Sequence, residues 1–249
     1  MNIEITGSPI FTTLPILGGI PITATLVVTW GIMLLLTVFC IWLTHDLRVD
    51  NVTTRQTIAE FLVNTAQGFV DNNMGVRFSH YAPFIAAIFS LSLLSSLSGL
   101  LGLFSPTADL STELGWAVLV FVLITATKIK TNGVGGYLKG YTQPIAVLTP
   151  FNIISEIATP ISMAFRHFGN IVSGTVISTL IYAALGTASH ALFSLLPGVV
   201  GDLLSQIPFL SVGIPAVFSL YFDWFSSFMQ AFIFCMLTMM YIAAAADAD

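Results

Sequence analysis

Charged residues are scarce in this sequence, and their scarcity excludes an ordinary soluble domain. Only 8% of the 249 residues are Asp, Glu, Lys or Arg, whereas 56% are hydrophobic. Soluble domains carry about 25% charged residues, so this chain has too few charges to cover a surface that faces water. The composition therefore predicts a polytopic membrane protein that is surrounded by membrane lipid.

Positive charge and cysteine are also scarce. Seven Lys and Arg stand against twelve Asp and Glu, and this net charge of −5 predicts no basic surface and no nucleic-acid partner. The two cysteines, Cys40 and Cys235, lie in apolar runs, where a buried thiol behaves as a small hydrophobe. The pattern contains no disulfide framework and no metal-ligand spacing.

Motifs of enzymes are lacking as well. The sequence has no G-x-x-x-x-G-K-[ST] phosphate loop. It has no recognisable nucleophile motif, and its four histidines are not spaced as metal ligands. We therefore expect neither a cofactor nor catalysis by this chain, and an intramembrane enzyme is the least favoured interpretation.

Long apolar segments are abundant, and a helix needs about 20 such residues to cross a bilayer. The expected fold class is therefore all-α, with five membrane-embedded helices in a single membrane domain over residues 1–249. A cleaved signal peptide is disfavoured for the first segment, because a basic n-region is missing and the apolar run is long. The expected spans are about 23–43, 80–104, 110–130, 152–190 and 213–246.

Residues 55–75 (RQTIAEFLVNTAQGFVDNNMG) have apolar side chains at helical spacing and polar ones largely on the other side. They predict an amphipathic helix on the membrane surface, and a soluble connecting helix is an equal alternative. Residues 131–144 (TNGVGGYLKGYTQP) predict a glycine-rich loop that turns the chain.

The basic residues orient the five spans. Six of the seven cations fall in two loops on one side, which the positive-inside rule makes cytoplasmic. The N-terminus is then outside, the C-terminus is cytoplasmic, and Glu113 falls with Asp109 and Asp202 in the outer loops. The six cations are Arg48, Arg55, Arg77, Lys128, Lys130 and Lys139.

The seventh cation, Arg166, is the only formally charged residue between Glu156 and Asp202. On a helix it shares one face with Gly169, Asn170 and Ser173, at i, i+3, i+4 and i+7. A charged residue at the centre of a span costs about 2.5–3.5 kcal/mol on insertion scales and usually marks an ion path.

The final segment has a matching polar stripe, with Asp223, Ser226, Ser227 and Gln230 at the same helical spacing. Arg166 and Asp223 could instead form a structural salt bridge, although buried pairs are weak sources of stability. The serines of the two stripes suit close helix packing better than a direct role in ion transfer.

These stripes resemble one family. The run R-x-F-G-N at Arg166, followed by Ser173 and Gly174, is similar to the signature of the a subunit of F-type ATP synthases. The C-terminal run QAFIFCMLTMMYIAAA resembles that family's last helix, with Gln230 as its glutamine. PTAD at 106–109 and TPFNIISEIATPIS at 149–162 resemble two further family segments, so the resemblance covers the chain from about residue 55 onward.

The resemblance implies a fold and a mechanism. The last two segments would form a long tilted hairpin against a rotating ring of c subunits, with the b-subunit stalk and the rest of the ATP synthase as further partners. Two offset half-channels would carry protons or sodium ions to and from the carboxylates of the c-ring. Arg166 would separate the two half-channels, and the short N-terminus suits a bacterial inner-membrane protein.

Some positions depart from the family's pattern. Many bacterial relatives have Leu where this chain has His167, and a His at this position suits either the ion path or packing. Relatives often carry Glu and His where Thr175 and Asp223 stand here. We therefore expect Asp223 to be the channel carboxylate and Thr175 to contribute more weakly.

Two acidic residues match positions of the family near the membrane surfaces. We expect Asp109 at the outer mouth of one half-channel and Glu156 at the cytoplasmic mouth of the other, with solvated helix-end carboxylates as an equal alternative. A different alternative for the whole chain is a self-contained secondary transporter in which Arg166 binds an anionic substrate.

Overall fold

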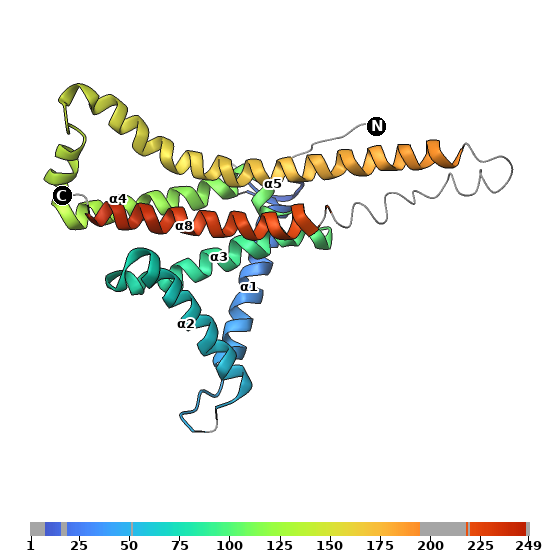
Figure 1. The fold of residues 1–249 in the computed structure, drawn as a ribbon, viewed down its shortest axis with the longest axis horizontal. Helices are drawn as coiled ribbons and strands as arrows, with labels where there is room; N and C mark the ends of the chain where they lie inside the picture. The colour runs from blue at the N-terminus through green and yellow to red at the C-terminus, as the bar shows by residue number, and fades with distance from the viewer. Residues whose placement is uncertain (1–7, 16–18, 51, 195–217, 219, 248–249) are drawn as a thin grey trace.

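In the computed structural model, residues 8–15, 19–50, 52–194, 218 and 220–247 are described (Figure 1). Within these ranges the regular structure consists of helices and one short hairpin, joined by short turns and loops. Five helices are long and apolar enough to cross a membrane, so the expected all-α polytopic class is confirmed.

The hairpin lies near the N-terminus and was not expected from the sequence. Strands β1 (Ile10–Leu14) and β2 (Ile20–Thr23) pair antiparallel, with Ile10 opposite Thr23. They are rich in Ile and Thr, which favour extended backbone. Helix α1 (Ala24–Thr44) follows directly, and the hydroxyl of Thr23 caps it by accepting a hydrogen bond from the Leu26 backbone amide.

Helix α2 (Thr54–Met74) connects α1 to the bundle, and Thr53 caps its first turn. Its apolar side chains Ile58, Phe61 and Leu62 remain exposed in the isolated chain. At its far end Phe69 packs on Phe232, with ring centroids 5.4 Å apart. Its position on the membrane surface stays a prediction.

A 3₁₀ turn, η1 (Val76–Tyr81), leads into helix α3 (Ala82–Leu97). Two more short turns, η2 (Ser98–Leu101) and η3 (Pro106–Ala108), then reverse the chain. The hydroxyl of Ser105 donates to the backbone carbonyl of Ser95 at 2.7 Å, which ties this reversal to the last turn of α3.

Helix α4 (Leu110–Gly140) is longer than the sequence suggested, and the loop predicted for 131–144 was wrong over most of its length. The chain kinks at Gly133, whose φ of 69° is open to glycine and strained for other residues. Helical backbone continues on both sides of that single residue. Gly133 therefore makes the turn as a single-residue kink between two helical stretches, and not as part of a loop over 131–144.

The last two long helices run side by side in opposite directions (Figure 1). Helix α5 (Thr149–Phe193) begins after the 3₁₀ turn η4 (Ala146–Leu148) and extends well beyond the bundle at its C-terminal end. The π-helical turn η5 (Leu220–Phe225) leads into helix α8 (Ser226–Asp247). Residues 213–217, which the sequence assigned to the last segment, lie outside the described residues.

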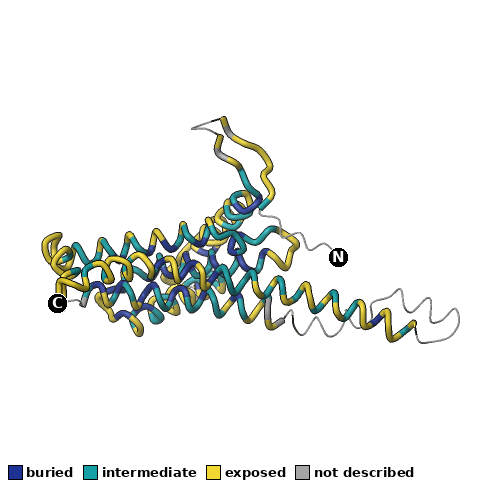
Figure 2. The backbone as a smooth tube through the Cα atoms, turned by 90° about the horizontal axis from the view of Figure 1, so that it is seen from above, coloured by how far each residue is buried: buried dark blue, intermediate teal, exposed yellow. Residues whose placement is uncertain are grey.

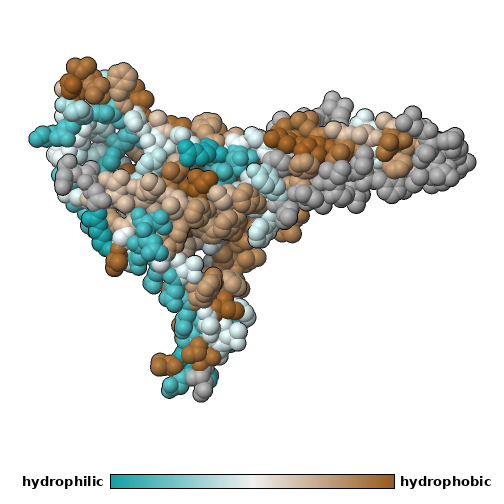
Figure 3. All heavy atoms as spheres, viewed as in Figure 1, coloured by the Kyte–Doolittle hydropathy of each residue, from teal (hydrophilic) through white to brown (hydrophobic). Residues whose placement is uncertain are grey.

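The buried core lies where α3, α4 and α8 meet, as the dark blue segments of Figure 2 show. Helix α1 and the outward arm of α5 bury little of their surface, and patches of apolar side chains lie along the described part of that arm in Figure 3. Such exposed apolar faces suit lipid or a partner subunit. The core comprises Val70, Met74, Phe78, Ala82, Ile85, Ile88, Val120, Ile124, Met163, Phe234, Cys235, Met239, Ile242 and Ala245.

Candidate functional site

Arg166 lies near the middle of α5, and its side chain is exposed at the surface of the isolated chain. Within the described ranges its guanidinium makes no ion pair or hydrogen bond with this chain. The structural salt bridge to Asp223, which the sequence left open, is therefore not formed here. A permanent cation is thus held at the surface of a long apolar helix without a partner among the residues that the structure describes.

Gln230 on α8 lies opposite Arg166. The two side chains line a cavity of about 10 Å³, together with His167 and four apolar residues. Such a volume is close to the space that one water molecule requires. Arg166, Gln230 and His167 therefore meet at one small hollow between α5 and α8, whose other lining residues are apolar.

Asn170 is one turn beyond Arg166 and joins the same two helices. Its Nδ2 donates to the hydroxyl of Ser226 on α8 at 2.6 Å. Ser173 is exposed further along α5, and Thr175 donates its hydroxyl to the backbone carbonyl of Ile171 at 3.0 Å. Asn170 thus helps to align the two polar stripes, whereas the Thr175 hydroxyl is engaged within its own helix.

Asp223 lies in η5, ahead of α8, and is half-buried. The sequence placed it on one α-helical face with Ser226, Ser227 and Gln230. This prediction was wrong in geometry, because residues 220–225 form a π-helical turn that changes the spacing. π-Helical turns occur frequently at functional sites.

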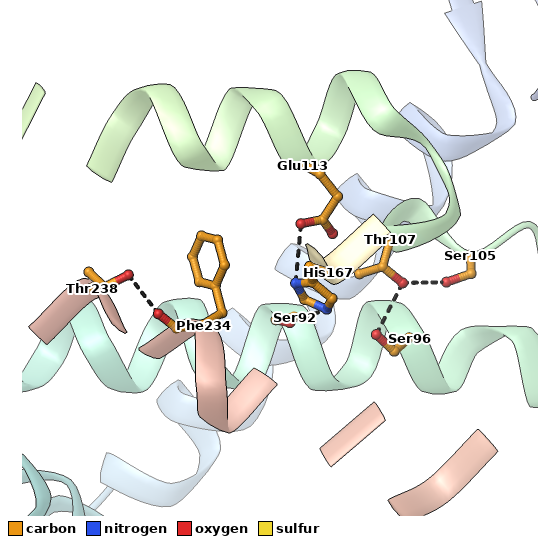
Figure 4. A network of polar contacts seen from close by, with 8 residues as sticks. All are labelled: Ser92, Ser96, Ser105, Thr107, Glu113, His167, Phe234 and Thr238. Carbon is orange, nitrogen blue, oxygen red and sulfur yellow. Dashed lines mark hydrogen bonds and ion pairs between the residues drawn. The ribbon is translucent and has the colours of Figure 1, made fainter. Parts of the chain in front are cut away.

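His167 points the other way, into the bundle, and is 1% exposed (Figure 4). Its Nδ1 lies 3.1 Å from Oε2 of Glu113 on α4, and its Nε2 lies 3.4 Å from the hydroxyl of Ser92 on α3. The rings of Trp116 and Phe234 border the imidazole at 6.3 and 5.8 Å between centroids. Three helices therefore converge on this histidine.

Glu113 was assigned to an outer loop by the sequence, and that assignment was wrong. The residue lies in the first turn of α4, and its side chain is fully buried. Its position there follows from the helix start, because Asp109 caps α4 and Glu113 comes one turn later. Apart from the ion pair with His167, neither oxygen of this carboxylate has a hydrogen-bond partner among the described residues.

Hydroxyl groups continue this polar region toward the start of α4 (Figure 4). The hydroxyl of Thr107 lies 3.0 Å from that of Ser96 and 2.8 Å from that of Ser105. Thr107 is fully buried, and so is Ser92 one turn below Ser96 on α3. We refer to Ser92, Ser96, Ser105 and Thr107 as the hydroxyl ladder.

Asp109 stands beside this ladder as the N-cap of α4. Its Oδ1 accepts a hydrogen bond from the Ser111 backbone amide at 3.0 Å, and its Oδ2 accepts one from the Thr25 hydroxyl at 3.0 Å. The carboxylate therefore fixes the start of α4 and ties it to α1, whatever it contributes to an ion path.

Glu156 lies at the opposite end, where its Oε1 is 2.8 Å from Nζ of Lys128. The pair borders a cleft of about 440 Å³ between α4, α5 and α8, which is also lined by Tyr137, Tyr141 and Asn152. Burial, followed by the hydrogen bond to Glu156, raises the pKa of Tyr141. Its neutral phenol can thus remain a donor to that carboxylate.

Comparison with known proteins matches this arrangement to one family. A family model described as ATP synthase A chain matches residues 26–243. The ATP synthase subunit a of Desulforamulus reducens is 33% identical over 221 residues, which cover 87% of this chain and 78% of the relative. That of Limosilactobacillus reuteri is 32% identical over 201 residues, covering 77% and 79%.

The chain belongs to the ATP synthase A chain family. It is an ion-translocating Fo subunit and a multi-pass membrane protein that works with the rest of the ATP synthase. The self-contained transporter is accordingly not favoured. A further relative, from Propionigenium modestum, is named ATP synthase subunit a, sodium ion specific, and is 32% identical over 198 residues, covering 72% of this chain and 60% of the relative.

Within this ATP synthase subunit, Glu113 is the residue that sequence reasoning missed. The sequence did carry one signal, since Glu113 follows the Asp109 cap by four residues, immediately before an apolar run. The expected span at 110–130 already contains position 113, so assigning Glu113 to that span and not to the loop would have placed its carboxylate in the helix bundle.

Proposed function

We propose that this a subunit forms two offset aqueous half-channels and that Arg166 separates them. An ion would enter by one half-channel, bind a carboxylate on the c-ring, travel round with the ring and leave by the other. The subunit itself would be a non-catalytic part of the stator, and ATP synthesis would occur in the soluble head.

The observation that carries this proposal is that the Arg166 side chain is exposed and has no ion-pair partner among the described residues. A buried or partnered cation would be the less costly arrangement. A carboxylate on a neighbouring subunit would complete it. Arginine keeps its proton in proteins, so it cannot relay one and would block a direct leak.

The same charge would also release the ion. A cation beside a carboxylate favours its ionised form, so a protonated ring carboxylate that approaches Arg166 would lose its proton to the exit half-channel. Gln230 and a water in the shared cavity would compete for the guanidinium and keep the pair from locking. Asn170, Ser173, Thr175 and Asp223 would line the path near this point.

Polar features on both sides of Arg166 support two half-channels. Glu156, which lines the cleft, lies ten residues before Arg166, about 15 Å along α5. The hydroxyl ladder and Asp109 lie toward the other end of the bundle. We assign the cleft to the cytoplasmic half-channel and the Asp109 end to the outer one, with the N-terminus outside and the C-terminus cytoplasmic.

The surroundings follow from the same assignment. The faces of α5 and α8 around Arg166 would contact the c-ring, the exposed apolar face of α1 would meet lipid, and the b subunit would hold the chain in the stator. The location would be the bacterial inner membrane. The coupling ion would be a proton or a sodium ion.

Arg166→Ala in membrane vesicles that contain the whole complex tests this function. ATP-driven acidification should fall at least tenfold, a loss of about 1.4 kcal/mol or more. The passive proton leak, recorded after the soluble head is removed, should rise because the barrier is gone. Arg48→Ala, which removes an exposed cation from the loop after α1, should change neither quantity.

Assembly is checked by co-purification of the c-ring and the soluble head. Normal pumping by an assembled Arg166→Ala complex would contradict the proposal. Ion transport by the purified chain alone, without a c-ring, would support the transporter alternative instead.

A further inference from the structure

Glu113 and His167 form a buried acid–base pair in the interior of the helix bundle. The two side chains are 0% and 2% exposed, and they come from different helices, α4 and α5. Ionisable residues inside membranes are costly and are usually found along ion paths. Their burial therefore calls for an explanation beyond packing.

The carboxylate of Glu113 lacks the hydrogen bonds that a purely structural buried carboxylate would make. Oε2 lies 3.1 Å from Nδ1 of His167, yet in the described chain neither this nitrogen nor either carboxylate oxygen has a hydrogen-bond partner of good geometry. A buried polar group without hydrogen bonds costs about 1–3 kcal/mol, and more when it is charged. A bound proton would relieve that cost.

Protons can reach the pair from the side of the hydroxyl ladder. Ser105, Thr107 and Ser96 are joined by contacts of 2.8 and 3.0 Å, and Ser92 contacts Nε2 of His167 at 3.4 Å (Figure 4). Ser92 and Ser96 are four residues apart on α3, about 6 Å along the axis. A single water would bridge such a gap, and the ladder begins beside Asp109 at the end assigned to the outside.

Protons can leave the pair toward the arginine. His167 borders the cavity of about 10 Å³ that Arg166 and Gln230 also line. His167 thus contacts Ser92 of the hydroxyl ladder and also lines the small hollow that it shares with Arg166 and Gln230.

We propose that Glu113 and His167 together hold the transported proton at the inner end of the outer half-channel, which makes the proton the coupling ion. This inference rests on the proposed function. A proton from the ladder would add to the ionised carboxylate or the neutral imidazole, and it would later pass to a water beside Arg166. Only O–H and N–H bonds form and break in this cycle.

Few other charged groups act on the pair. Helix α3 contributes none, α4 contributes Asp109 one turn away, and α5 contributes Arg166 as the adjacent residue. On α8 the neighbouring thiol of Cys235 is directed to the Ile85 carbonyl. The positive charge of Arg166 would favour release of the proton, because it stabilises the pair after the proton has left.

Passive proton flow through the complex without its soluble head tests this inference. Glu113→Gln keeps the shape of the side chain but cannot bind a proton, so flow should fall at least tenfold across the pH range and its pH profile should lose one inflection. Glu113→Asp should keep a measurable flow. Asp46→Asn, which alters an exposed carboxylate paired with His45, is the matched control and should leave flow and profile unchanged.

A double variant that removes both ionisable side chains separates a structural role of the pair from a role in proton transfer. Replacing a buried ion pair by apolar residues of similar volume is often neutral or stabilising. Glu113→Leu combined with His167→Leu should therefore keep the complex assembled, as judged by co-purification and thermal stability, while proton flow stays at least tenfold reduced.

Normal flow in Glu113→Gln or in the double leucine variant would overturn the inference, and so would flow that depends on sodium and not on pH. The Arg166→Ala result is read separately. If Arg166→Ala raises the leak while Glu113→Gln changes nothing, the proposed function stands and only the role of the pair is lost.

Discussion

Two carboxylates on either side of Arg166 are paired with a basic side chain, and their surroundings differ sharply. The Glu113–His167 pair is 0% and 2% exposed, whereas the Glu156–Lys128 pair is 10% and 30% exposed and borders a cleft of about 440 Å³. The comparison suggests that ions cross one side of the membrane through protein groups and the other side through water.

The residues around each pair fit this difference. Around Glu113 the polar groups are the small hydroxyls of the ladder, which fit inside a packed bundle. Around Glu156 they are large side chains, including Tyr137, Tyr141 and Asn152, which frame an open space. A path of fixed groups is sensitive to each member, while a water-filled path tolerates the loss of one.

The largest effect is expected from breaking the hydroxyl ladder. Ser96→Ala combined with Thr107→Val removes the contact of 3.0 Å between the two hydroxyls with little change in volume. Passive proton flow should fall about tenfold, equivalent to about 1.4 kcal/mol in the barrier. The measurement is flow through vesicles that lack the soluble head.

Thr125→Val is the matched control for this double variant, because the Thr125 hydroxyl is also buried in α4 but lies outside the ladder. Its flow should remain normal. Equal losses of proton flow in the double variant and in Thr125→Val would mean that the ladder acts only through packing. The proposed difference between the Glu113 side and the Glu156 side would then be lost.

The sequence predicted the broad features of this molecule because they depend on local composition. Long apolar runs fixed the five membrane-spanning helices, and Arg166 stood out as a lone cation among apolar residues. The helical stretch of α4 beyond Gly133 was not predicted. Its glycines favour a loop in the sequence, whereas in the structure one residue with positive φ makes the kink and helical backbone resumes after it.

The Glu113–His167 pair could not be predicted because it is a tertiary contact. The two residues are 54 positions apart, and neither helix face alone indicates the other. The sequence did single out His167, but one helix cannot tell whether its side chain points into the bundle or out of it. The π-helical turn at Asp223 likewise has no simple pattern in the sequence.

A smaller effect is expected from Asp109, which lies beside the hydroxyl ladder at the end of the bundle that we assign to the outside. Asp109→Ala removes the cap of α4 and the acceptor for the Thr25 hydroxyl. Losing a helix cap costs about 1 kcal/mol, so thermal unfolding of the complex should begin at a lower temperature. Asp109→Asn keeps a capping oxygen and should retain most of the stability.

Proton flow in the same two variants separates capping from an ion-path role. If Asp109→Asn has normal stability and normal flow, the carboxylate is a cap and the path begins at the ladder. If Asp109→Asn has normal stability but reduced proton flow, the negative charge of Asp109 is needed for transfer, and the path through the hydroxyl ladder extends to the surface at Asp109.

The smallest effect is expected from Lys128, on the wet side. Solvent-exposed ion pairs contribute about 0–1 kcal/mol and are screened by salt, and the Glu156–Lys128 pair, although partly buried, borders the open cleft. Lys128→Met keeps the apolar stem, so it should change thermal stability by about 0.5 kcal/mol or less and proton flow by less than twofold, with any difference shrinking as salt is added. Water in the cleft can hydrate Glu156 once the lysine side chain is removed. Glu113, in contrast, would be a buried carboxylate with neither access to water nor a charged partner among the described residues if His167 were removed. A tenfold loss of flow in Lys128→Met would mean that the cleft conducts through fixed groups after all, and the two sides of Arg166 would then work in the same way.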